Sequence, residues 1–155
     1  MIPATETNLW RSLTSAFKLY GINATRIETG STKVGVGDVT YVVTDGDAGW
    51  LELKAAAYPS KPSTSIRFNR RLTIEQFVWL AQHDNPKKFR RSYVLVGLAG
   101  ERSWSYLLLE PAASRGLIDD KGHVFRNLEE WSALPGARFF EDAESVAKFL
   151  ISKKL

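Results

Sequence analysis

The chain is 155 residues long, 44% hydrophobic and free of cysteine. This is enough for a single domain with a core, spanning 1–155, and it excludes disulfides and thiolate metal sites. There is neither an apolar run long enough to cross a bilayer nor a signal-peptide pattern, so we expect an intracellular protein without a membrane partner. The formal net charge of +4 and the pI near 9.4 favour an anionic partner, of which nucleic acid is the commonest.

The N-terminal segment predicts an amphipathic helix over 5–20 and a first strand over 23–29. Thr5 or Thr7 is a suitable N-cap, and Glu6 falls in the first turn, where the helix dipole favours an acid. Apolar residues recur at helical spacing, namely Leu9, Leu13, Ala16, Phe17 and Tyr20.

The centre of the sequence predicts a β-hairpin that carries three charged side chains. An apolar strand follows Asp38, an Asp/Gly-rich turn occupies 45–49, and the returning strand contains Glu52 and Lys54. Residues two apart in a strand share a face, so Glu52 and Lys54 point the same way and the neighbouring leucines point into a core. The turn folds Asp38 back to within a residue or two of the position opposite Glu52. Two carboxylates and an ammonium therefore meet at one end of the sheet.

This constellation has a chemical interpretation. Two convergent carboxylates bind a hard divalent cation such as Mg²⁺ or Mn²⁺, which polarises a phosphoryl oxygen and lowers the pKa of bound water. A lysine beside the cation orients the attacking water, so the expected reaction is phosphodiester hydrolysis. The alternative is that Asp38 merely starts a strand and that Glu52 and Lys54 lie on a solvated strand face.

Basic charge gathers in two stretches without any acid, over 58–71 and 86–92. The polar loop over 59–71 is long enough to be functional, and we expect it to contact DNA phosphates as a flap. The DNA-contact candidates are Lys33 before the hairpin, then Lys61, Arg67, Arg70, Arg71, Lys87 and Lys88. An exposed lysine without any specific contact is the alternative for Lys33.

A second helix is predicted over 73–83. Thr73 and Gln76 have the spacing of a capping box, in which each side chain satisfies a free backbone N–H. The expected buried stripe consists of Ile74, Phe77, Val78 and Ala81. His83 lies near the end of this helix, where a cation is favoured.

The remainder predicts strands over 93–98 and 104–109, a short helix from Asn127 to Leu134, a strand over 138–140 and a helix over 142–155. With the hairpin and the first two helices, these elements predict an α/β domain with a mixed sheet flanked by helices.

Gly37-Asp38, the hydrophobic strand and Glu52-Leu53-Lys54 resemble the signature of the PD-(D/E)XK nuclease superfamily, with glycine in place of the usual proline. Together with residues 72–80, they are similar to small phage-type nucleases of the virus-type replication-repair (VRR-NUC) branch and to Holliday-junction resolvases. The resemblance covers roughly the first ninety residues. It implies a restriction-endonuclease-like α/β core.

The resemblance also implies roles for individual residues. The implied metal contacts are Asp38, Glu52 and Leu53, and Lys54 would position the water. Glu6 or Glu28 would be a helper acid, and Gln76 would lie near the active site. The alternatives are a solvated helix-start acid at Glu6, a surface ion pair at Glu28 and a purely capping role for Gln76.

The expected function is a metal-dependent DNA endonuclease, with branched or junction DNA as a candidate substrate in phage DNA processing or recombination. If a phage encodes it, the protein would act in the cytoplasm of the host cell. Junction resolvases cut two strands symmetrically, and by that analogy we expect a homodimer. The alternatives are a non-catalytic DNA-binding accessory protein on the same fold, and basic loops that bind a protein or RNA.

Overall fold

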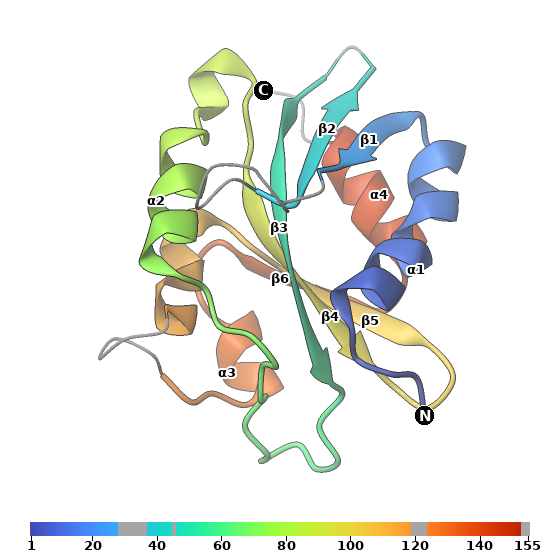
Figure 1. Ribbon diagram of the computed structural model, residues 1–155, viewed down its shortest axis with the longest axis vertical. Helices are drawn as coiled ribbons and strands as arrows, with labels where there is room; N and C mark the ends of the chain where they lie inside the picture. Colours follow the sequence, from blue (N-terminus) through green and yellow to red (C-terminus); the bar gives the residue numbers. More distant parts are fainter. Residues whose placement is uncertain (28–36, 45, 119–123, 153–155) are drawn as a thin grey trace.

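A computed structural model describes residues 1–27, 37–44, 46–118 and 124–152. Its centre is a mixed sheet of six described strands in the order β1-β2-β3-β4-β5-β6, with helices on both faces (Figure 1). The strands are β1 Ile22–Arg26, β2 Val39–Val43, β3 Ala48–Ala57, β4 Tyr93–Ala99, β5 Trp104–Leu109 and β6 Ala137–Phe140. The helices are α1 Glu6–Leu19, α2 Ile74–Gln82, α3 Leu128–Ser132 and α4 Ala143–Ser152, with short 3-10 helices η1 Pro86–Lys88 and η2 Pro111–Leu117.

Strand β3 lies in the interior of the sheet. It pairs antiparallel with β2 and parallel with β4, whereas every other described pair is antiparallel. A parallel pair needs a crossover connection, and residues 58–92, which include α2, supply it. Because both faces of β3 are covered, Leu51 through Ala56 are all buried. The charged residues of this strand are therefore buried together with its apolar ones.

Two hydrophobic layers hold the sheet. Helices α1 and α4 cover one face and α2 and α3 lie on the other, as Figure 1 shows. Leu9, Leu13 and Phe17 of α1 pack with Leu51 and Leu53 in the first layer. The second layer contains residues of α2, η2 and α3, namely Leu80, Leu117 and Trp131, against β4 and β5. The alternation of β3 thus directs its leucines to α1 and its charged residues to the α2 side.

The prediction of which α2 residues form the buried stripe was wrong, because the helix is rotated by about one residue from the expected orientation. Ile74 and Val78 are 48% and 43% exposed, whereas Leu80 is fully buried. Residues 76, 77, 80 and 83 form the inner face, because the helix turns Gln76 toward β3 and Leu80 into the core. Ile74, Val78 and Ala81 therefore lie on the surface, whereas Phe77 packs against the core as expected.

Several predicted boundaries also moved. Strand β1 ends at Arg26 rather than 29, and β3 continues to Ala57 instead of leaving the sheet after Lys54. Within the predicted polar loop over 59–71, Phe68 forms a single bridge to Ala56. Helix η2 had no prediction, since its proline start and small residues lack an apolar period. In the described part of the chain, no helix has both the length and the apolar character needed to cross a membrane.

Candidate active site

The β2–β3 hairpin places Asp38 beside Glu52. Val39 pairs with Leu51, so Asp38 comes directly before this pair on one strand and Glu52 directly after it on the other. Asp38 Oδ2 accepts a hydrogen bond from the Leu53 N–H at 2.9 Å. The N–H and C=O of one strand residue face the same neighbour, so the Leu53 carbonyl faces the Asp38 side as well. Both acids and this peptide unit therefore converge where β2 begins.

Glu52 and Lys54 are buried, with exposed fractions of 1% and 3%. Their head groups lie side by side, with Lys54 Nζ 3.6 Å from Glu52 Oε2. The alternative of a solvated strand face is therefore wrong. Burying a carboxyl and an ammonium costs free energy unless both are paired or hydrogen-bonded. Their burial therefore points to a role other than keeping the surface soluble.

Burial raises the pKa of Glu52 from its usual 4.5 to about 10, and the neighbouring Asp38 carboxylate adds to the rise through hydrogen bonding and charge repulsion. Lys54 opposes the rise without cancelling it. Within the described residues, Glu52 Oε1 is buried and has no hydrogen-bond donor. The protein alone therefore leaves an oxygen atom unsatisfied at this point.

Helix α2 supplies the partner of Lys54. The capping box that the sequence predicts is present: Thr73 Oγ1 accepts from the Gln76 N–H at 3.1 Å, and Gln76 Oε1 accepts from the Thr73 N–H at 3.0 Å. The same Gln76 oxygen lies 3.4 Å from Lys54 Nζ and accepts a second hydrogen bond. One side chain therefore both caps the helix and orients the lysine.

Glu6 lies at the start of α1, and its carboxyl is partly buried near the two acids. Burial raises the pKa of Glu6, and the charge of Asp38 raises it further. Lys54, Arg70 and Arg26 act in the opposite direction. The structure thus brings Glu6 into electrostatic range of the site, whereas Glu28 lies outside the described residues.

A cavity of about 380 Å³ adjoins Glu6. It is lined by residues of α1, β1, β3 and the polar loop, namely Ala4, Thr5, Glu6, Thr7, Arg26, Ala55, Asn69 and Arg70. Arg26 Nη1 donates to Thr7 Oγ1 at 3.2 Å, and Asn69 Nδ2 donates to the Ala4 carbonyl at 2.6 Å. Sequence reasoning missed Arg26 and Asn69 as site neighbours, because no local pattern distinguishes them.

The acid pair fits a hard divalent cation. Such an ion would neutralise the repulsion between Asp38 and Glu52 and use the unsatisfied Glu52 oxygen, and carboxylate and carbonyl oxygens are the ligands it takes. No group of three or more His, Asp or Glu side chains that could hold a metal occurs in the described ranges. The ion would therefore depend on two carboxylates, the Leu53 carbonyl and water.

The candidate DNA-contacting cations differ in their surroundings. Lys61, Arg67 and Arg70 are exposed, as are Lys87 and Lys88. Lys33 lies outside the described residues.

Arg71, which is the remaining DNA-contact candidate, and Arg91, which is not a candidate, contact other side chains of the protein. The Arg71 guanidinium lies 5.2 Å from the centre of the Phe125 ring. Arg91 is 5% exposed and forms ion pairs with Asp84 and Glu110. The basic charge that the sequence shows over 86–92 is therefore partly neutralised inside the fold.

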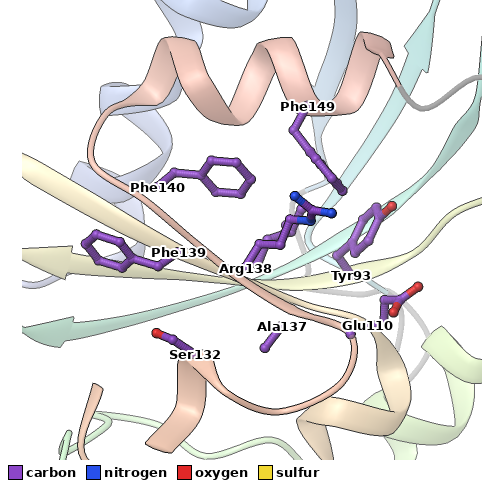
Figure 2. Close-up of a pocket in the computed structure, with 10 residues that line it drawn as sticks. Tyr93, Glu110, Ser132, Ala137, Arg138, Phe139, Phe140 and Phe149 are labelled. Atoms are coloured by element: carbon purple, nitrogen blue, oxygen red, sulfur yellow. The ribbon is translucent and has the colours of Figure 1, made fainter. Parts of the chain in front are cut away.

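A second cavity, of about 480 Å³, lies beside β6 and α4. Figure 2 shows Arg138 extending between Tyr93 and Phe149, and its guanidinium lies 4.9 Å from the centre of the Phe149 ring. Glu110 borders this cavity and is paired with Arg91. None of the acids of the β2–β3 hairpin lines it, so it is separate from the candidate active site.

No family model matches the chain, and no curated protein matches its sequence. Among solved structures, Hjc, a Holliday junction resolvase from the archaeal hyperthermophile Archaeoglobus fulgidus, is similar in fold with a TM-score of 0.53. The match has 12% sequence identity and covers 91% of this chain and 98% of that one. The predicted fold class, a nuclease-like α/β core with a mixed sheet flanked by helices, is therefore confirmed.

Proposed function

We propose that the protein is a divalent-metal-dependent endonuclease that hydrolyses phosphodiester bonds in branched or junction DNA. The observation that carries this proposal is the buried pair of Asp38 and Glu52 with Lys54 beside it, in which a Glu52 oxygen has no donor among the described residues. The likeness of the fold to a Holliday junction resolvase supports it. Resolving a junction requires two cuts, so a homodimer is the expected working form.

In this mechanism Asp38, Glu52 and the Leu53 carbonyl would hold Mg²⁺ or Mn²⁺. The ion supplies Lewis-acid polarisation of the phosphoryl oxygen and a more acidic bound water. Lys54 donates one hydrogen bond to Gln76, and an ammonium has further donors for the attacking water or the phosphate. Glu6 adds negative charge next to the acids. Exposed Lys61, Arg67 and Arg70 hold the flanking DNA backbone.

The test is a cleavage assay on a four-way junction, a forked duplex and a linear duplex, each with Mg²⁺, Mn²⁺ or a chelator. We expect cuts near the branch that require the metal and that Lys54→Ala abolishes. Salt-sensitive DNA binding without any metal-dependent product would instead identify a non-catalytic accessory protein. Equal cleavage by wild type and Lys54→Ala would exclude the assigned site.

Two variants of the capping box separate stability from catalysis. Thr73→Ala should lower the free energy of unfolding by about 1 kcal/mol, because an N-cap oxygen is lost, and should leave the cleavage rate nearly unchanged. Gln76→Ala should cost similar stability and also slow cleavage about tenfold, because Lys54 loses its charged hydrogen bond. Urea denaturation and single-turnover cleavage measure the two effects. If both variants cleave equally fast, Gln76 acts only as a cap.

A further inference from the structure

Three aromatic rings line the α2 side of β3 beside the acids. Trp50 precedes Glu52 by two residues and therefore lies on the same face of the strand. The Trp50 and Trp79 ring centres are 4.7 Å apart, and the His83 ring stacks on Trp79 at 3.4 Å with an angle of 16°. Each ring is partly exposed. The helix that carries Gln76 to Lys54 thus carries Trp79, one turn later, to Trp50.

A basic turn lies against the start of the same strand. Asn85 and Arg90 exchange two backbone hydrogen bonds, of 2.7 and 3.1 Å, which close the turn. The Ala48 N–H donates to the Phe89 carbonyl at 2.9 Å, so the turn is fixed beside β3. A Cβ at Gly49 would collide with the Arg91 backbone oxygen, so only glycine allows this close approach. The exposed cations Lys87, Lys88 and Arg90 therefore belong to a turn whose backbone contacts β3 at Ala48 and Gly49, the residues just before Trp50.

Phe89 in this turn has an unusual position. Its φ of 59° lies in the left-handed region, which no other non-glycine residue enters in the described part of the chain, and its side chain is 53% exposed. A bulky residue in that conformation is strained, and strained residues gather at functional sites. The left-handed backbone ends η1 and presents the Phe89 carbonyl to Ala48, so it has a structural role. The exposed ring has no such role in packing, and a binding role accounts for it.

Exposed rings interspersed with cations are the composition of surfaces that bind single-stranded nucleic acid. Bases stack on the rings while the cations follow the phosphates. Two strand residues span about 7 Å, so a base at Trp50 and a phosphate at Glu52 fall within the reach of one nucleotide. A base inside a duplex is already stacked and paired and cannot occupy such a position.

We propose that Phe89 and the Trp50–Trp79–His83 group stack unpaired bases of a DNA strand whose backbone continues to Asp38 and Glu52. This inference rests on the proposed nuclease function and specifies how its substrate is recognised. The protein thereby selects DNA at the point where a strand leaves the duplex, and the ring positions set where the cut falls relative to the branch.

The test compares the affinity of the metal-free protein for a forked DNA and for a blunt duplex of equal length. The loss of a phosphate contact weakens the binding of both DNAs equally, so the ratio of the two affinities reports base stacking alone. We expect wild type to prefer the fork and Phe89→Gly to reduce the preference by roughly tenfold. Phe89→Gly removes an exposed ring from a conformation that glycine adopts freely, so folding is retained.

Trp79→Ala provides a second variant, and Tyr58→Ala is the matched control. Tyr58 is an aromatic residue with 44% exposure that lies past the opposite end of β3. We expect Trp79→Ala to lose the fork preference and Tyr58→Ala to keep it. Metal-dependent cleavage by a wild type that binds forks and duplexes equally would overturn this inference and leave the proposed function standing. Fork preference that depends on Phe89 and Trp79, without cleavage in any metal, would support the aromatic site and contradict the nuclease assignment.

Discussion

Glu52→Gln is expected to abolish metal-dependent DNA cleavage and, at the same time, to stabilise the metal-free protein. The rate should fall by about a thousandfold or more, because a neutral amide cannot replace a carboxylate in a divalent site and metal catalysis contributes several kcal/mol. Stability should rise because the buried Glu52 carboxyl must either take up a proton or remain charged away from water, and both cost free energy. An amide at this position needs neither and can donate a hydrogen bond to Asp38. For a chain of this length each kcal/mol corresponds to about 2–4 °C in Tm.

The measurement pairs thermal unfolding at pH 8 without metal with single-turnover cleavage. Glu75→Gln is the matched control: Glu75 is an exposed glutamate in the first turn of α2. It should change neither property appreciably. A Glu52→Gln protein that cleaves at the rate of wild type would show that Glu52 is not a metal ligand. One that unfolds at a lower temperature than wild type would show that Glu52 stabilises the fold as an ion-pair partner of Lys54.

The stability of the metal-free protein should fall, relative to Glu52→Gln, as the pH rises from about 5 to about 9. The folded state raises the pKa of Glu52 from 4.5 to about 10, so between these values the folded protein binds a proton that the unfolded chain has lost. Stability then decreases with pH, by at most about 1.4 kcal/mol per pH unit for one proton. Groups that do not interact with Glu52 titrate equally in both proteins, so the difference between the two Tm values reports Glu52 together with the neighbours coupled to it, Asp38, Lys54 and Glu6.

Mg²⁺ should reverse this trend, because the ion binds ionised Glu52 and displaces its proton. The affinity for Mg²⁺ should therefore rise with pH, by up to about tenfold per unit in this window. Calorimetry in buffers of different ionisation heat counts the released proton directly. Binding of Mg²⁺ without proton release would contradict the raised pKa of Glu52, and identical pH profiles of the two proteins without metal would do the same.

The local features of the site followed from the sequence, because short-range physics decides them. The Asp/Gly turn sets the hairpin, the two-residue period of a strand puts Glu52 and Lys54 on one face, and together these bring Asp38 across from Glu52. The capping box joins Thr73 and Gln76, which are three residues apart, so its hydrogen bonds can also be predicted from the sequence.

Only the tertiary structure decided how these local pieces face one another. The rotation of α2 depends on contacts with β3 and η2, and it reversed the expected burial of Ile74 and Val78. The crossover that joins β3 to its parallel neighbour β4 contains α2, which covers the face that carries Glu52 and Lys54, and no strand pattern predicts that burial. It also carried Trp79 to Trp50 and the basic turn to the start of β3. Periodicity and turn chemistry act over a few residues, whereas burial, pKa and the neighbours of a side chain are set by segments that meet only when the chain folds.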